Sequence, residues 1–285
     1  DKWVSGLKPL VDSVHKNRAA IGVQLWMGDE MPNGEKVAPS PTEGYREITA
    51  AELEDLVRKF AVAARAARDI GFDTINVHGA HGYFLHQLFS PLTNRRGDKY
   101  GGSLERRMTF GVECVRAIRE AVGEDYPIMY RLSATEFTPG GIQLEDSIAF
   151  AKKLQEAGAD ILDVSAGSRT EPAKMVIPDK DQPVGTHVEP AAAIKKVVDV
   201  PVVAVGRLHT REACDEVLEQ GKADLVAVGR QLLADPYWPN KLMEWRDEEV
   251  VKCLSCNVKC AGNLDKGEPI ECVVNPELGK ESLRS

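Results

Sequence analysis

The sequence contains no long uninterrupted run of apolar residues. Hydrophobic residues make up 43% of the chain, but no segment approaches the ~20 consecutive apolar residues that a membrane-spanning helix needs. Residues 1–4 also lack the charged and apolar regions of a secretory signal peptide. We therefore expect a soluble, cytoplasmic protein that has no membrane partner.

Basic residues are fewer than acidic residues. The chain has 36 Lys and Arg residues against 44 Asp and Glu residues, which gives a formal net charge of -8. This balance argues against a general nucleic-acid-binding protein, so we expect no nucleic-acid partner. It leaves room for a local basic pocket that binds a phosphate group.

Cysteine is scarce over most of the chain. Of the six cysteines, only Cys114 and Cys214 lie outside the segment 253–272. Both fall inside helical patterns, so we expect them to be packed structural thiols. Evenly spread cysteine pairs would be typical of a secreted disulfide scaffold, whereas the clustering of the other cysteines indicates a metal site.

Short β-branched segments alternate along the chain with amphipathic helical segments. The predicted strands are residues 21–26, 74–78, 127–132, 161–165, 202–205 and 225–228. The predicted helices are residues 2–16, 51–70, 104–122, 144–157, 191–197 and 210–220. Thr49 and Glu52 predict a capping box at the start of the second helix, and Gly71 predicts its end.

This alternation indicates parallel strands joined by crossover helices, as in the α/β class and its TIM (β/α)8 barrel. A doubly wound sheet usually has a Gly-rich turn after its first strand, and the sequence has none there. Six strands are predicted, so a complete barrel needs two more, which we expect to precede Asp1. We assign residues 1–250 to the barrel, incomplete at its N-terminus, and residues 251–285 to a Cys-rich extension.

Polar side chains follow the predicted strand 74–78, at the point where a barrel places its active site. The segment His78-Gly-Ala-His81-Gly-Tyr83 brings two imidazoles and a phenol close together in sequence. The imidazoles can donate hydrogen bonds to one carbonyl oxygen, and Tyr83 can give a proton to carbon. The alternatives are a metal pair or two core histidines, although the sequence identifies no third protein ligand for zinc.

The cysteine segment reads Cys253-Leu-Ser-Cys256-Asn-Val-Lys-Cys260 and is followed by Cys272. Four thiolates at close spacing suit a tetrahedral metal ion or a [4Fe–4S] cluster. Zinc is a serious rival on the spacing alone, because the spacing differs from that of the ferredoxins.

Several segments resemble the Old Yellow Enzyme family of NADH:flavin oxidoreductases. The resemblance is carried by residues 23–26, 78–83 and 94–107, and it continues to residues 228–236. We expect the segment 94–107 to be structural and to link a loop to the next helix. Cysteines placed after such a barrel, with Asn275-Pro276 behind the fourth, resemble the iron–sulfur branch, which includes 2,4-dienoyl-CoA reductase, enoate reductase and trimethylamine dehydrogenase.

The resemblance implies that FMN and a [4Fe–4S] cluster are the cofactors. Gln24 would hydrogen-bond the pyrimidine edge of the flavin, and Arg131 would stabilise negative charge near its N1 atom. Glycines after the last two strands let backbone N–H groups approach an anion. The phosphate would be held by Gly206, Arg207, Gly229 and Arg230. The cluster would be held by Cys253, Cys256, Cys260 and Cys272.

The resemblance also implies an ene reductase. His78 and His81 would bind the carbonyl oxygen of a small α,β-unsaturated carbonyl, carboxylate or enoyl-CoA substrate, and Tyr83 would protonate its α-carbon. NADH or NADPH would supply the electrons, through an FAD- and NAD(P)-binding domain or a redox partner, and the cluster would pass them singly to FMN. Arg169 would meet an anionic part of the substrate or lie solvated in its loop. A homo-oligomer is compatible with this reading.

One loop departs from the family pattern. The family commonly has Gln-Leu-Trp-His-Ala-Gly-Arg where this chain has Gln24-Leu-Trp-Met-Gly-Asp29, so the contacts of this loop stay open. An amine dehydrogenase or demethylase is the alternative activity, although aromatic residues that could form a cage for a cation make up only 6% of the chain. An electron-transfer flavoprotein subunit and a zinc-stabilised barrel without a redox role are two further alternatives.

Overall fold

A six-stranded parallel sheet forms the centre of the structure, a computed structural model that describes residues 2–168 and 175–281. The strands are β1 (Gly22–Leu25), β4 (Thr74–Gly79), β5 (Ile128–Ser133), β6 (Ile161–Ser165), β7 (Val202–Ala204) and β8 (Leu225–Val226). Each strand pairs in parallel with the next in this order, so β1 and β8 form the two ends of the sheet. The strand order is that of a (β/α)8 barrel, as the sequence predicts.

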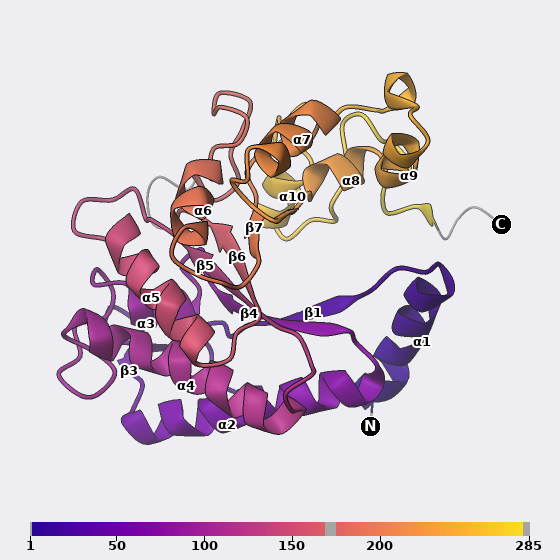
Figure 1. The fold of residues 1–285 in the computed structure, drawn as a ribbon. Helices are drawn as coiled ribbons and strands as arrows, with labels where there is room; N and C mark the ends of the chain where they lie inside the picture. The colour runs from indigo at the N-terminus through magenta and orange to yellow at the C-terminus, as the bar shows by residue number, and fades with distance from the viewer. Residues whose placement is uncertain (1, 169–174, 282–285) are drawn as a thin grey trace.

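Helices connect successive strands and lie around the sheet (Figure 1). The longer helices are α1 (Lys2–Lys16), α2 (Ala50–Ile70), α4 (Leu104–Val122), α5 (Leu144–Glu156), α6 (Val188–Lys195) and α7 (Arg211–Glu219). The shorter ones are α3 (Phe84–Phe89), α8 (Arg230–Ala234), α9 (Trp238–Met243), η2 (Asp247–Glu249) and α10 (Ala261–Asp265). A separate small sheet pairs β2 (Val37–Ala38) with β3 (Arg46–Glu47). Within the described residues, no helix has both the length and the apolar character that crossing a bilayer requires.

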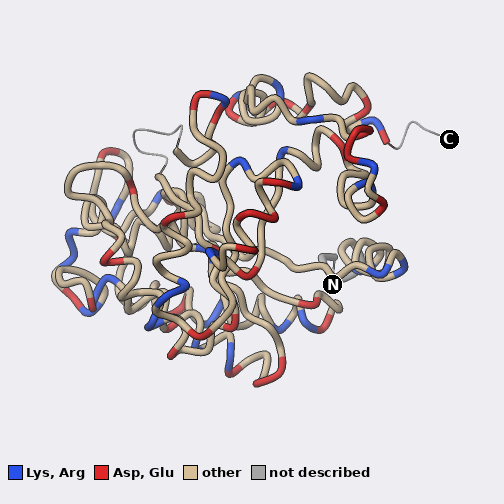
Figure 2. Tube along the Cα trace, turned by 45° about the horizontal axis from the view of Figure 1, so that its top comes forward, with Lys and Arg blue, Asp and Glu red and all other residues tan. Residues whose placement is uncertain are grey.

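The core lies between the sheet and the outer helices. Ile75 of β4 and Leu162 of β6 are fully buried, and Ile118 of α4 packs into the same cluster. Burying an aliphatic side chain of this size stabilises the fold by about 1.5–3 kcal/mol. Cys114 and Cys214 are both buried, which confirms that they are packed thiols. Acidic and basic residues are interspersed along the chain, as Figure 2 shows.

The ends of helix α2 follow from the sequence. Thr49 accepts a hydrogen bond from the Glu52 N–H, and the Glu52 carboxylate accepts one from the Thr49 N–H, so the predicted capping box is confirmed. Gly71 ends the helix with φ of 109°, in the left-handed region that favours glycine. These local signals fix where the helix begins and ends, and packing against α4 then fixes its position.

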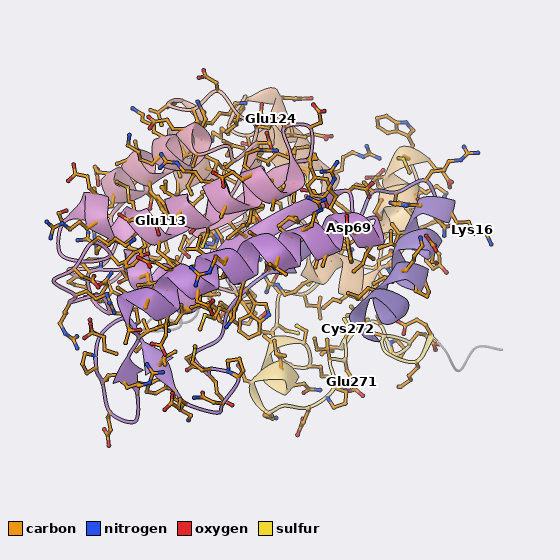
Figure 3. All side chains as sticks on the ribbon, turned by 90° about the horizontal axis from the view of Figure 1, so that it is seen from below. Lys16, Asp69, Glu113, Glu124, Glu271 and Cys272 are labelled. Atoms are coloured by element: carbon orange, nitrogen blue, oxygen red, sulfur yellow. The ribbon has the colours of Figure 1, made fainter. Side chains whose placement is uncertain are left out.

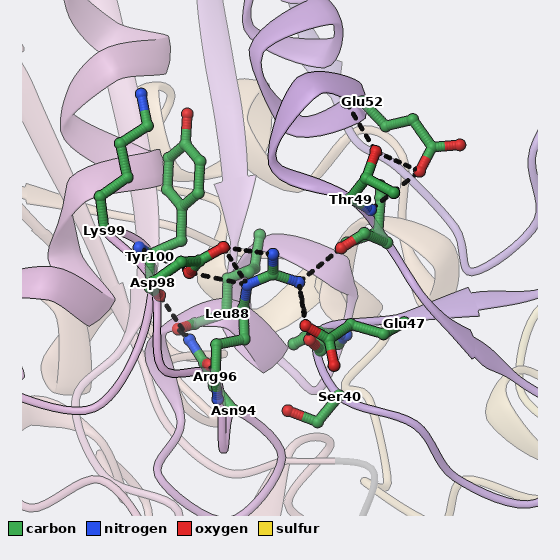
Figure 4. A network of polar contacts seen from close by, with 12 residues as sticks. Ser40, Glu47, Thr49, Glu52, Leu88, Asn94, Arg96, Asp98, Lys99 and Tyr100 are labelled. Carbon is green, nitrogen blue, oxygen red and sulfur yellow. Dashed lines mark hydrogen bonds and ion pairs between the residues drawn. The ribbon is translucent and has the colours of Figure 1, made fainter.

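The side chain of Arg96 links the segment 94–107 to the chain that precedes α2 (Figure 4). It is 3% exposed. Its Nη1 donates to the carbonyl oxygens of Pro39 at 2.9 Å and Ile48 at 2.5 Å, and its Nε donates to Asp98 at 3.0 Å. A buried guanidinium with all of these acceptors is a structural crosslink. These contacts support the structural role that the sequence predicts for this segment.

Replacement of Arg96 should therefore destabilise the protein strongly. We expect Arg96→Ala to lower the free energy of unfolding by about 3 kcal/mol, because it leaves buried carbonyl oxygens without a donor. Arg95→Ala is the matched control: Arg95 is exposed, so its loss should change stability by less than about 0.5 kcal/mol. Urea denaturation of both variants measures the difference, and equal losses would contradict the crosslink.

Candidate active site and cysteine cavity

The register of the parallel strands brings the predicted site residues to one end of the sheet. His78 of β4 lies opposite Arg131 of β5, and Arg131 lies opposite Asp163 of β6. Two residues further along the same strands, Ser133 lies opposite Ser165. Because the strands are parallel, the loops that follow them all leave from this edge, where a barrel places its active site.

His78, His81 and Tyr83 form one cluster at this edge. The ring centroids of His78 and His81 are 5.2 Å apart, and those of His78 and Tyr83 are 5.0 Å apart. His81 has a φ of 63°, which places its ring beside β6. Its backbone N–H donates to Ser133 Oγ at 3.0 Å, and its Nε2 lies 2.8 Å from Ser165 Oγ. The two serines therefore hold His81 in an unfavourable backbone conformation.

Close packing at Gly79 fixes the path of the chain between His78 and His81. A Cβ at Gly79 would collide with the ring of Tyr130 on the neighbouring strand β5. Tyr130 is fully buried and has no space to move aside. Only glycine therefore allows β4 and β5 to approach this closely at the end where the imidazoles lie.

Both imidazoles of the cluster are neutral at neutral pH. Burial lowers the pKa of His78 to about 4, and the charge of Arg131 adds to this effect. Burial also places the pKa of His81 well below its usual value. A neutral imidazole keeps one N–H donor, so each ring can donate a hydrogen bond without placing a second positive charge beside Arg131.

Arg131 is held by an acidic partner that the sequence analysis did not identify. Its Nη1 lies 3.3 Å from Asp163 Oδ2, which also accepts a hydrogen bond from Asn76 Nδ2 at 3.1 Å. Burial raises the pKa of Asp163, and Arg131 opposes that shift. Arg131 Nε is buried and has no hydrogen-bond partner among the described residues. This donor is therefore available to a bound molecule with an acceptor atom.

A cavity opens beside Arg131, at the ends of β7 and β8. Its walls include five of the six residues that the sequence predicts to hold FMN: Arg131, Gly206, Arg207, Gly229 and Arg230. Gly206 has a φ of 119°, and a Cβ on it would meet the backbone N of His187 at 2.9 Å. Two arginines and two glycine-containing loops suit a phosphate group, and the unpartnered Arg131 Nε suits an anionic ring. The cavity thus fits FMN.

The four clustered cysteines line a second, smaller cavity, and Figure 3 shows Cys272 on the C-terminal segment. Three of them, Cys253, Cys256 and Cys260, come from one loop. Among residues 2–168 and 175–281, no three His, Cys, Asp or Glu side chains stand close enough to share a single metal ion. The thiols instead lie on the walls of a common space. Four thiols around one space are the donor set that a [4Fe–4S] cluster takes.

The two cavities share a wall. Arg230 and Cys253 line both of them. Gln231, the next residue of helix α8, is 1% exposed, and its Oε1 accepts a hydrogen bond from the Cys253 N–H at 2.8 Å. Burial lowers the pKa of Arg230, and the neighbouring thiol groups oppose the shift. The partly buried Arg230 therefore lies between the cysteine cavity and the arginine-lined cavity.

Four predicted residues do not line the cavity beside Arg131: Gln24, His78, His81 and Tyr83. Gln24 is exposed on β1, at one end of the sheet, and does not line the cavity beside Arg131. Tyr83 lies at the mouth of the site, where it lines a separate cavity with Trp26 and Asp29. Asp29 belongs to the loop that departs from the family pattern, and it accepts a hydrogen bond from Tyr45. Arg169 lies outside the described residues.

The sequence analysis missed several residues that complete the site. Asp163 could have been found as an acidic residue inside an otherwise apolar strand. Ser255 and Gln231 carry no such signal, because their importance depends on which loops meet in three dimensions. His187 lines the cavity beside Arg131 and is 1% exposed, and burial lowers its pKa to about 4.

Comparison with known proteins agrees with this geometry. The chain is 44% identical over its whole length to 46% of an NADH oxidase from Thermoanaerobacter brockii. It is 34% identical to a cinnamate reductase from Clostridium sporogenes, with 95% of the chain and 45% of that protein aligned. The chain thus spans about half the length of the curated relatives that it matches most strongly.

Solved structures share the fold. The chain superposes on 2-naphthoyl-CoA reductase with a TM-score of 0.90 and 29% identity, over 99% of this chain and 46% of that one. It superposes on histamine dehydrogenase from Rhizobium sp. 4-9 with a TM-score of 0.86 and 29% identity, over 98% of this chain and 42% of that one. The sequence pattern of one family matches residues 1–249. The chain belongs to the NADH:flavin oxidoreductase / NADH oxidase family.

Proposed function

We propose that this chain is the catalytic part of an FMN-dependent oxidoreductase that uses NADH or NADPH to reduce an activated C=C bond. The observation that carries the proposal is the His78–His81–Tyr83 cluster, which lies at the same edge of the sheet as the arginine-lined cavity. Two similar proteins, a cinnamate reductase and a 2-naphthoyl-CoA reductase, are named for reducing unsaturated carboxylic compounds. The substrate class is therefore a small unsaturated carbonyl, carboxylate or thioester.

Some residues of the chain would bind FMN, and others would stabilise negative charge on its ring. FMN, when bound, supplies the hydride. Gly206 and Gly229 bring backbone N–H groups to its phosphate, with Arg207 and Arg230 beside them. Arg131 offers its unpartnered Nε toward the ring and stabilises negative charge there, while Asp163 fixes the guanidinium from the other side. We keep the proposal that Gln24 contacts the pyrimidine edge of the flavin. Because the Gln24 side chain is exposed on β1, this contact requires the side chain to move toward the flavin.

The histidines and the tyrosine act on the substrate. His78 and His81 are neutral and donate hydrogen bonds to the substrate oxygen, so that negative charge developing on this oxygen is stabilised. Tyr83, at the mouth of the site, holds the proton that is delivered to the α-carbon. The ring of Trp26 lies 5.1 Å from the ring of Tyr83 and shields that face of the site.

We assign residues 251–285 to the binding of a [4Fe–4S] cluster through Cys253, Cys256, Cys260 and Cys272. A bound cluster would supply single electrons. The shared wall formed by Arg230 and Cys253 supports a position for the cluster next to the FMN cavity. Because the similar NADH oxidase and cinnamate reductase are each about twice as long as this chain, we propose an FAD- and NAD(P)-binding domain or a separate redox partner as the electron source.

Amine oxidation is the second candidate function. The structure of histamine dehydrogenase superposes on almost the whole chain. The neighbouring rings of Trp26 and Tyr83 could also contact a cationic amine. The two neutral histidines favour the ene reductase, because they present donors suited to an oxygen atom.

Cofactor analysis tests the proposal first. We expect the protein purified without oxygen to contain about one FMN and four iron atoms per chain. Absorbance, iron and zinc determination, and flavin release measure these contents. A preparation with zinc and without iron or flavin would overturn the proposal. Turnover of amines with no turnover of enoates, enones or enoyl-CoA thioesters would favour the second candidate.

The role of Tyr83 is tested separately. We expect Tyr83→Phe to slow reduction of the C=C bond about 100-fold in single-turnover assays, because the variant lacks the acidic proton. Its FMN content should stay unchanged, since the phenol lies outside the FMN cavity. Tyr237→Phe, at an exposed tyrosine, is the matched control and should keep the full rate. A full rate in Tyr83→Phe would exclude it as the proton donor.

Burial of His78 predicts a pH dependence of stability. Between pH ~6.5 and 4 the His78 imidazole is protonated in the unfolded state and neutral in the folded state. The free energy of unfolding therefore falls as the pH is lowered through this range. The loss amounts to about 1.4 kcal/mol per pH unit for one histidine. His78→Asn should therefore flatten the dependence of the urea midpoint on pH. An unchanged slope would show that His78 can be protonated in the folded state.

A further inference from the structure

The loop that carries three of the cysteines also contacts two of the three arginines that line the FMN cavity. Arg207 Nε donates to Ser255 Oγ at 3.3 Å, and Arg230 Nη1 donates to Asn257 Oδ1 at 2.5 Å. Asn257 Nδ2 donates in turn to the carbonyl oxygen of Ile177, which lines the same cavity. Each arginine proposed to hold the phosphate is therefore held itself by a residue that lies between cysteines.

The backbone at these contacts is constrained. Arg207, Ser255 and Asn257 have φ angles of 58°, 50° and 57°, in the left-handed region that non-glycine residues rarely adopt. Such conformations cost about 1 kcal/mol or more each and persist only where the surrounding contacts enforce them. Their occurrence on both sides of the same interface indicates that the cysteine loop and the arginine loop are built as one unit.

Ser255 is placed to bind the phosphate directly. It is 2% exposed and lines the cavity together with Gly206 and Gly229. Because its Oγ accepts the hydrogen bond from Arg207, its O–H proton remains available to an acceptor in the cavity. A phosphate oxygen between the two arginines is the acceptor that this site would take.

The cysteine loop is also anchored at its first thiol. The Cys253 N–H donates to Gln231, and the Ser255 N–H lies 3.4 Å from Cys253 Sγ. Cys253 lines both cavities, so a displacement of its thiol moves the backbone that carries Ser255. Ligation of the thiols would restrict the motion of the loop. Ordering Ser255 and Asn257 against the arginines when FMN binds would then cost less conformational entropy.

We propose that Ser255 is a further phosphate-binding residue and that Asn257 couples occupation of the cysteine cavity to FMN affinity. The coupling rests on the proposed function, because it requires a cluster at the four cysteines. Coupling between binding sites is reciprocal, so bound FMN also stabilises the cluster. The chain thus loads its two cofactors cooperatively through contacts of its own side chains.

The phosphate assignment is tested with two flavins. We expect Ser255→Ala to raise the Kd for FMN about tenfold, as fits the loss of a hydrogen bond to a charged group. The Kd for riboflavin, which lacks the phosphate, should stay the same, whereas a merely structural role would weaken both. Flavin fluorescence quenching measures both constants. An unchanged Kd for FMN, or equal losses for the two flavins, would overturn the assignment.

The coupling is tested by removing the iron. The Kd for FMN is measured for the iron-loaded protein and for protein treated with a chelator and a thiol reductant. We expect removal of the iron to raise the Kd about tenfold in the wild type and to have little effect in Asn257→Ala. Asn263→Ala is the matched control and should keep the wild-type ratio, because the Asn263 side chain lies in the same extension and donates to the carbonyl oxygen of Pro269.

The outcomes separate the two proposals. An iron-loaded wild type whose Kd for FMN does not change on chelation would overturn the coupling and leave the proposed function intact. A protein that never binds iron would overturn the cluster assignment and the coupling with it. In that case the comparison of FMN with riboflavin in Ser255→Ala still decides whether Ser255 binds the phosphate.

Discussion

Parallel pairing of the strands in sequence order is the constraint on which the site depends. It gives each strand the same direction, so the loops after β4, β5, β6, β7 and β8 leave from one edge of the sheet. His78, Arg131 and Asp163 occupy opposite positions on three neighbouring strands as a result. No single loop could bring these side chains together. A slip of one residue would point Arg131 to the other face of the sheet.

The long elements could be predicted from the sequence, because an amphipathic period repeated over several turns outweighs local exceptions. Helix α2 is an example, with its capping box and terminal glycine. Helix α6 begins at Val188 rather than at residue 191, since Pro190 in its first turn conceals the start. The short helices α3, α8, α9 and α10 span too few residues for any period to emerge.

The residues of the candidate site also fall into those that could be predicted from the sequence and those that could not. The positions of His78, Tyr83 and the glycine–arginine pairs at or just after strand ends could be predicted from the sequence, and their roles in the site stay predictions. Asp163, Ser255 and Gln231 gain their roles only from contacts between distant segments, which the order of residues does not reveal. Arg207 and Ser255 are 48 residues apart in the sequence, yet a hydrogen bond joins their side chains. Gln24 illustrates the opposite case, in which the motif is clear and the described structure leaves the side chain exposed.

The contact between Gly79 and Tyr130 has a consequence for how this protein can vary. Strands β4 and β5 can exchange many of their apolar residues for others of similar volume, provided that the core stays filled. At Gly79 no such exchange exists, because even a methyl group would force the strands apart where His78 faces Arg131. Among natural variants we would therefore expect Gly79 and Tyr130 to change together or not at all. New substrate preferences would then arise in the loops, while the distance between these two strands stays fixed.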